Sequence, residues 1–231
     1  MAPPHARPYV PLAMAALVMM QAGCNPIRPS NAPRFEGDAA AGQILAQKTC
    51  AACHGLDGNA VSPAIPKLAG QYPEYIQKQL LAFTPGPDGK PKRLSPVMGP
   101  IASALSKADM ANAAAYFSGQ TLVPSGARDP RRIMLGQKVY AEGDPDRGLP
   151  ACITCHRPTG TGIRPDFPQI GGQNPDYLDD QLTHWEQTRG HPGKLMSMIV
   201  PHLQPDERQA VADYISQLRP ENETSPKRTL R

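Results

Sequence analysis

Two short segments of the chain place two cysteines and a histidine at the spacing Cys-x-x-Cys-His, at residues 50–54 and 152–156. Two thiols three residues apart can add to the two vinyl groups of one porphyrin, and the histidine that follows can then reach the iron. The sequence therefore predicts two covalently bound haem c groups, each with a histidine as an axial iron ligand. The predicted attachment residues are Cys50, Cys53, Cys152 and Cys155, and the predicted ligands are His54 and His156.

Two other kinds of site use paired cysteines. A structural zinc ion needs four ligands gathered in one place, and a thioredoxin-like redox pair belongs to a βαβ unit. Neither kind of site explains why a histidine directly follows both pairs.

The opposite face of each iron decides what such a haem does. A closed site with a strong sixth ligand carries electrons, whereas an open site binds small molecules or catalyses. Met98 lies 44 residues after His54, and Met196 lies 40 residues after His156. A thioether is a neutral, soft ligand that favours Fe(II). Because the two methionines occupy matched positions, we predict both as sixth ligands.

Other side chains compete for these roles. Methionine also fills gaps in apolar cores, so Met98 and Met196 could simply pack there. Met198 is the nearest competitor in the second half. Three histidines are further rivals, but none has a counterpart in the first half, which favours a surface or packing role: His184, His191 and His202.

Two prolines follow the motif histidines at equal distances. Pro66 and Pro168 each lie twelve residues after their histidine. A carbonyl group there could accept a hydrogen bond from the histidine Nδ1–H and fix the ring; a rigid loop turn is compatible with the same role. Aromatic residues that could approach a haem edge are expected instead to belong to the core: Tyr72, Tyr75, Tyr177 and Trp185.

The motifs are parts of an internal repeat. The offset between matched residues is 94 before the motifs, 102 across and after them, and 98 at the methionines. The second half therefore contains eight additional residues before its motif, within 142–149. The matched pairs include Gly42 with Gly136, Gln71 with Gln173, Tyr75 with Tyr177, and Met98 with Met196.

Each half is expected to contain three or four helices, with no competing strand pattern, so the fold class is all-α. The expected helix starts are about Asp38, Pro73 and Ser106 in the first half, and Pro130, Pro175 and Pro205 in the second. Proline suits the first helical turn. Ser106 and Asp109 predict a capping box, and Asn174 is expected to cap the helix after it.

Length and composition fit two domains. The 231 residues allow two units of about 100 residues, which we expect at 35–120 and 130–219, joined by a linker at 121–129 and followed by a polar, disordered tail at 220–231. Aromatic residues make up only 5% of the chain, and a haem would supply the missing large apolar body in each half. The net charge of +4 comes without a basic stripe, so nucleic acid is not an expected partner.

The N-terminal segment has the pattern of an export signal. Residues 1–23 combine a positively charged start, an apolar stretch too short to span a membrane, and small residues at the end. The segment Ala22-Gly23-Cys24 is similar to the end of a bacterial lipobox, where the cysteine receives a lipid. We therefore expect a lipid on Cys24, followed by a linker at 24–34; ordinary cleavage nearby is the alternative.

Several segments together resemble the diheme cytochrome c4 family of bacterial electron carriers. They cover about residues 40–218 and include 50–55 (CAACHG), 66–71 (PKLAGQ), 75–80 (YIQKQL), 113–117 (AAAYF), 170–173 (IGGQ), 177–182 (YLDDQL) and 212–215 (ADYI).

The resemblance implies two tandem cytochrome c-like domains, each wrapped around one haem c. It also implies the axial pairs His54/Met98 and His156/Met196. Similar proteins pass electrons between respiratory complexes and terminal oxidases, and their haems are attached outside the cytoplasmic membrane. A periplasmic location, with membrane association through the expected lipid, follows. Two departures from the family are expected to matter: the insertion before Cys152 reshapes the partner surface of one domain, and Arg157, where the first half has Gly55, makes the two haem environments differ.

Two other functions compete with that of an electron carrier. A diheme peroxidase or a thiosulfate-oxidising cytochrome would need an open or unusually ligated iron, which the matched methionines disfavour. A cytochrome subunit of a periplasmic dehydrogenase would use the same haem chemistry, so the sequence leaves that reading open.

Overall fold

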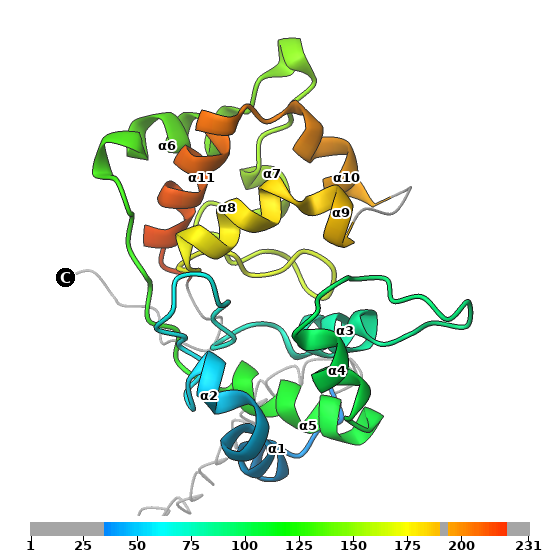
Figure 1. Cartoon of the computed structure of the whole chain (residues 1–231). Coiled ribbons are helices and arrows are strands. Elements are labelled where there is room, and N and C mark those ends of the chain that lie inside the picture. The colour runs from blue at the N-terminus through cyan, green and yellow to red at the C-terminus, as the bar shows by residue number, and fades with distance from the viewer. Residues whose placement is uncertain (1–34, 190–193, 221–231) are drawn as a thin grey trace, which may run out of the picture. The chain divides into compact units, whose positions relative to one another are not determined.

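Helices joined by long loops make up each half of the computed structural model, which describes residues 35–189 and 194–220 (Figure 1). The first half contains α1 (Ala39–Leu45), a π-helical turn (Ala46–Cys50), α2 (Ala51–His54), α3 (Pro73–Phe83), α4 (Met98–Ser103) and α5 (Lys107–Ser118).

The second half repeats this order with more interruptions. It contains α6 (Ile133–Glu142), α7 (Ile153–His156), α8 (Pro175–Thr183), α9 (Trp185–Arg189), α10 (Leu195–Ile199) and α11 (Pro205–Gln217), with short 3-10 turns at Pro130–Arg132, Pro145–Arg147 and Val200–His202. Among the described residues, extended pairing is limited to isolated bridges. The expected all-α fold is confirmed.

The helix starts follow the capping signals of the sequence, with one correction. Pro73 and Pro175 occupy the first turns of α3 and α8, and Ser106 forms the expected capping box with Asp109 at the start of α5. Asn174 precedes α8 but makes no side-chain capping bond. Its amide instead donates to the carbonyl groups of Ser62 and Ile65 in the first half, which are partly buried and need a hydrogen-bond partner.

A glycine lies at the main helix crossing of each half. Helix α1 packs on α5, and α6 packs on α11 (Figure 1). A Cβ atom added to Gly42 would lie 2.0 Å from the backbone oxygen of Asn112, and one added to Gly136 would lie 2.1 Å from that of Ala210. These helices therefore approach so closely that only glycine fits. The repeat pairs Gly42 with Gly136 because both halves use this crossing.

Each half has its own cluster of buried apolar side chains, to which the crossing helices contribute. The cluster of the second half is centred on Tyr140, Leu149 and Val211. The cluster of the first half is smaller and is centred on Ile76, Ala114 and Phe117. Cores this small bury little apolar surface by themselves, and a large apolar group bound in each half would add to that buried surface.

The segment between the halves has no regular structure but is bound to the second half by salt bridges. Residues 121–127 have no regular structure. Arg128 then contacts the fully buried carboxylate of Asp213 on α11 at 2.9 Å and Asp176 on α8 at 2.8 Å. The linker is thus bound along its end rather than loose.

The inserted residues of the second half form a short structured turn. Arg147 contacts Asp144 at 2.6 Å within this turn and also contacts Glu207 at the start of α11. The guanidinium group also donates to the carbonyl oxygen of His202. The insertion therefore packs against the start of α11 and the short turn before it.

The residue that ends each motif helix has a positive φ angle. Gly55 follows α2 with φ 75° and ψ 150°, and Arg157 follows α7 with φ 64° and ψ 163°. Within the described ranges, Arg157 is the only residue other than glycine that has a positive φ angle. Such a conformation costs a residue with a side chain about 1–3 kcal/mol, so the second half contains strain that the first half avoids.

Several expectations fall outside the described residues: the signal peptide at 1–23, the lipid site Cys24, the whole linker at 24–34, His191, and the tail beyond Pro220. In the part of the chain that is described, no helix is both long and apolar enough to cross a bilayer.

Replacing Gly42 by alanine is expected to destabilise the protein by about 1–3 kcal/mol, because the new methyl group would force α1 and α5 apart. Chemical unfolding followed by circular dichroism measures this change. Gly119→Ala is the control, since the nearest atoms to a Cβ there lie at 3.5 Å and 3.8 Å. Equal losses in the two variants would contradict a close crossing at Gly42.

Arg157→Gly is expected to stabilise the protein by about 1 kcal/mol, because glycine adopts this conformation without strain. The reverse change in the first half, Gly55→Arg, should destabilise it. The midpoints of thermal unfolding compare both variants with the parent chain. A loss of stability in Arg157→Gly would show that the arginine side chain contributes more than its backbone costs.

Candidate functional site

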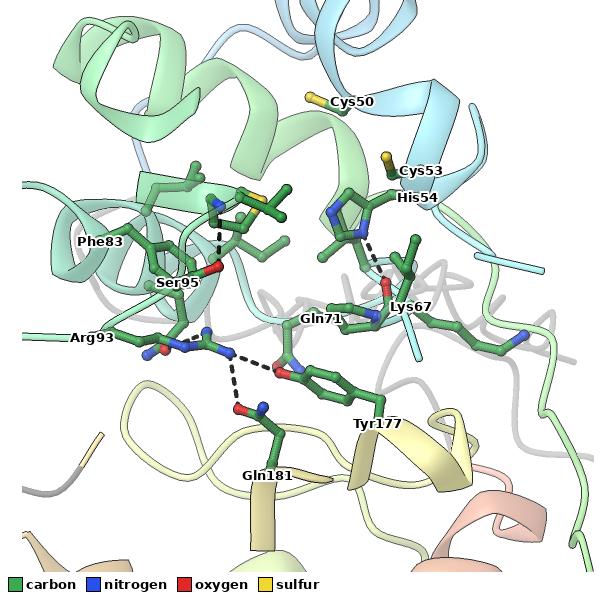
Figure 2. A pocket seen from close by; sticks show the side chains of 18 of the residues that line it. Cys50, Cys53, His54, Lys67, Gln71, Phe83, Arg93, Ser95, Tyr177 and Gln181 are labelled. Atoms are coloured by element: carbon green, nitrogen blue, oxygen red, sulfur yellow. Dashed lines mark hydrogen bonds between the residues drawn. The ribbon is translucent and has the colours of Figure 1, made fainter. Parts of the chain in front are cut away.

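The first motif opens onto a cavity of about 620 Å³, a volume within the usual range of cofactor sites. Cys50, Cys53, His54 and Met98, the four predicted haem-site residues of the first half, all line it. Figure 2 shows the two thiols and the imidazole ring together on one side of the cavity. The remaining wall is mainly apolar and includes Ile76, Leu80, Phe83, Ile101, Leu105, Ala113 and Phe117.

Each motif histidine is held by a backbone carbonyl group, as expected from the matched prolines. His54 Nδ1 lies 2.9 Å from the oxygen of Pro66, and His156 Nδ1 lies 3.1 Å from the oxygen of Pro168. A carbonyl oxygen can only accept, so each Nδ1 carries the proton. Nε2 therefore keeps its lone pair, which is the form that binds a metal. Burial lowers the pKa of both imidazoles, which also favours this neutral state.

Two of the motif thiols lie in surroundings that disfavour the thiolate. Desolvation raises the pKa of Cys50 above its usual value and that of Cys152 to about 11. A redox-active pair needs a thiol with a lowered pKa, so these thiols do not have the character of a thioredoxin-like site. Among the described residues, no three histidine, cysteine or acidic side chains are grouped to hold a metal ion.

The second motif is placed like the first, but its methionine lies on a shorter helix. Cys152, Cys155 and His156 lie at α7, and Met196 lies in the first turn of α10. Met196 is half-buried, whereas Met198 is 65% exposed. Burial therefore favours Met196 over Met198. None of the second half's predicted haem-site residues lines the first cavity.

The rival histidines have surface positions where the structure describes them. His184 is exposed and pairs with Asp180, four residues earlier on the same helical turn. His202 is also exposed. Both observations agree with the surface role that the sequence favours.

Residues of the second half complete the wall of the first cavity, which the sequence did not predict. The lining includes Gln169, Gln173, Tyr177 and Gln181. In Figure 2, Tyr177 and Gln181 are joined by hydrogen bonds to Arg93 of the first half. This first cavity is therefore bounded by both halves of the chain.

Two arginines, the buried Arg189 and the half-buried Arg93, meet on one phenol at this boundary. Arg93 and Arg189 donate to the hydroxyl oxygen of Tyr177 at 3.0 Å and 2.9 Å, and Arg189 also donates to Tyr75. Neither guanidinium group makes an ion pair with a described carboxylate, and Nε of Arg189 is buried without a hydrogen-bond partner. Buried positive charge without a counter-ion is costly, so these groups suit an anionic ligand.

This cluster corrects the assignment of the aromatic residues to the core. The hydroxyl groups of Tyr75 and Tyr177 accept hydrogen bonds from the arginines. The guanidinium carbon of Arg189 lies 5.1 Å from the centre of the Trp185 ring. The hydroxyl of Tyr72 donates to the carbonyl oxygen of Thr161 in the second half. Arg93 and Arg189 have no counterparts in the repeat, so a repeat-based reading could not find them.

Two glutamines, one from each half, form hydrogen bonds with backbone groups of the other half. The amide of Gln71 bonds to both backbone groups of Gln169, donating at 2.7 Å and accepting at 3.1 Å. The amide of Gln173 bonds in the same way to Lys67, at 2.9 Å and 2.7 Å. Gln71 and Gln173 are repeat partners, as are Lys67 and Gln169, so the contact has approximate two-fold symmetry.

Taken together, these side chains fit a covalently attached porphyrin. Two thiols, a neutral imidazole with a free Nε2, and a thioether line the cavity with apolar walls. The guanidinium groups at the boundary have no described carboxylate partner, and they match the acid side chains that a haem carries.

A cytochrome c family model matches residues 39–120 and again residues 133–219. A cytochrome c4 from Pseudomonas aeruginosa is 40% identical over 186 residues, covering 79% of this chain and 89% of that protein. The crystal structure of reduced recombinant cytochrome c4 from Pseudomonas stutzeri is 38% identical, with a TM-score of 0.72, covering 80% of this chain and all of that one. A thiosulfate dehydrogenase electron acceptor from Stutzerimonas stutzeri is 36% identical, covering 74% of this chain and 79% of that protein.

Proposed function

The chain belongs to the diheme cytochrome c4 family of electron-transfer proteins with two covalently bound haem c groups, and we propose that it relays single electrons between two haems that each have a histidine and a methionine ligand. The observation that carries this proposal is the meeting of Cys50, Cys53, His54 and Met98 on one cavity. We propose domain bounds of 35–120 and 130–219, because these ranges enclose the helices of each half.

The side chains have distinct roles in this proposal. Cys50 and Cys53 in the first half, and Cys152 and Cys155 in the second, form the thioether links. The pairs His54/Met98 and His156/Met196 would supply the two protein ligands of each iron. A bound haem iron accepts and releases one electron by changing between Fe(III) and Fe(II). A thioether ligand stabilises Fe(II) and fills the position where a small molecule would otherwise bind.

The cluster at the boundary has a supporting role. Arg93 lines the cavity, shares the hydroxyl of Tyr177 with Arg189, and has no carboxylate partner among the described residues, so this cluster is placed to bind the acid side chains of the porphyrin. Buried positive charge favours the reduced state of a nearby iron, so these residues also raise the reduction potential.

The family's electron-carrier function excludes catalysis as the main role, and the methionine positions agree. Met98 lines the cavity and Met196 is half-buried. Mixing the reduced protein with hydrogen peroxide separates a carrier from a diheme peroxidase: slow oxidation is expected, and rapid turnover with a reduced donor would overturn the proposal.

The partners we propose are redox proteins that the chain meets in the bacterial periplasm: a respiratory complex or a terminal oxidase. One relative is named as the electron acceptor of a thiosulfate dehydrogenase, which supports a second candidate role: accepting electrons from a periplasmic dehydrogenase. Copurification of the native protein with its partner distinguishes the two roles.

Export and a lipid on Cys24 would place the protein at the membrane surface. The pattern of residues 1–23 and an unpaired cysteine at the expected cleavage site support this proposal. In the membrane fraction, the intact mass should equal that of the chain from Cys24 onward, with two haems and the acyl chains. A mature protein with haems but without acyl chains would rule out the anchor and leave the electron-transfer role intact.

Met98→His is expected to lower the reduction potential of the haem in the first half by far more than that of the haem in the second half, because imidazole stabilises Fe(III) relative to a thioether. Redox titration measures both potentials, and the Fe–S(Met) charge-transfer band of the oxidised protein should lose one haem's contribution. Equal shifts of both haems, or an unchanged band, would contradict the assignment of Met98.

A further inference from the structure

One peptide group in each half contacts both a motif histidine and a glutamine of the other half. The carbonyl of Pro66 accepts from His54 Nδ1–H at 2.9 Å, and the N–H group of the same peptide, on Lys67, donates to Oε1 of Gln173 at 2.7 Å. The two bonds lie on opposite sides of one planar unit. A rigid peptide therefore links the imidazole of the first half to an amide of the second.

The same arrangement occurs with the roles of the halves exchanged: the peptide belongs to the second half and the glutamine to the first. The carbonyl of Pro168 lies 3.1 Å from His156 Nδ1, and the N–H group of the same peptide, on Gln169, donates to Oε1 of Gln71 at 3.1 Å. The arrangement is thus present twice, although the two halves differ elsewhere in their loops. The presence of the same bonds in both copies of the repeat argues against an incidental contact.

From this geometry we infer that Gln71 and Gln173 are positioning residues that act across the boundary, each adjusting the reduction potential of the haem in the opposite half. The inference rests on the proposed function, because it requires His54 and His156 to be iron ligands. Both glutamines also line the first cavity, and the inferred effect of each on the opposite haem acts through the peptide that orients the ligand.

The direction of the effect follows from hydrogen-bond cooperativity. When the N–H group of a peptide donates to an amide oxygen, the carbonyl of that peptide becomes a stronger acceptor. A stronger acceptor draws the Nδ1 proton away from the ring and makes the imidazole a more basic ligand. A more basic ligand favours Fe(III) and lowers the potential. Gln173 therefore lowers the potential of the first haem, and Gln71 that of the second.

Burial makes the effect local. Lys67, Gln71, Gln169 and Gln173 are all buried, so water does not readily replace a lost partner. Each amide oxygen also accepts from the N–H group of the next residue, Tyr72 or Asn174. Because backbone N–H groups only donate, the orientation of both amides is fixed, with the oxygen toward the histidine-bearing peptide.

The experiment exchanges each glutamine for leucine in the protein with both haems bound. Leucine removes the amide and cannot ligate iron. In Gln173→Leu, the equilibrium constant for reduction of the first haem is expected to rise about threefold to tenfold, a tenfold change being about 59 mV for one electron. In Gln71→Leu, the second haem should change instead. Redox titration gives the potentials, and proton NMR of the haem methyl groups assigns each to its haem.

A second measurement separates tuning from loss of structure. The His54 Nδ1–H proton should exchange with solvent faster in Gln173→Leu than in the parent chain, whereas His156 Nδ1–H should not change. Gln173→Glu keeps an acceptor oxygen and should restore slow exchange and a low potential. If Gln173→Leu does not fold, Gln71→Leu and Gln173→Glu still decide the question.

Tyr72→Phe is the matched control, since it removes another hydrogen bond between the halves without touching either histidine-bearing peptide. Equal shifts of both haems, a larger shift in the glutamine's own half than in the opposite half, or shifts no larger than in Tyr72→Phe would overturn the inference. Haem content, measured first, keeps the two proposals apart: a chain without two haems contradicts the proposed function, whereas two haems without crossed shifts contradict this inference alone.

Discussion

The hydrogen bond from each motif histidine to a proline carbonyl is the constraint around which the structure is arranged. A buried imidazole needs a partner for its Nδ1 proton, and that partner fixes which nitrogen is free for iron. The loop between residues 54 and 66 serves this end: Leu68 donates to the carbonyl of Gly58, and Gly58 has a positive φ angle. In the second half, Ile170 and Gly160 repeat this bond. The glycine-dependent helix crossings then fix where each motif begins.

The two halves share this frame but differ in what surrounds it. The second half has a strained Arg157 where the first has Gly55, and an inserted turn fastened by Arg147. The boundary is also unequal, because Arg93 comes from one half and Arg189 from the other without repeat partners. Two haems in such different surroundings are expected to have different potentials, which gives an electron a preferred direction.

Much of this arrangement could be predicted from the sequence, because its causes are local. The motifs, the capping box at Ser106 and the proline-led starts of α3 and α8 all depend on residues a few positions apart. The proline carbonyls were predictable because the repeat placed them at equal distances. The arginine cluster and the crossed amides were not, since they depend on how the halves meet. Asn174 shows the limit: its position is that of a cap, but its side chain bonds across the boundary.

The crossed amides also describe how such a chain could have arisen. Each half presents both the glutamine and the peptide that the other half's glutamine binds. A surface that carries both members of a contact is self-complementary, as in the isologous interface of a two-fold homodimer. Two copies of a single ancestral half could therefore have paired through these bonds before a gene duplication joined them. On this view the linker did not create the interface; it made an existing partnership permanent and allowed the two copies to diverge.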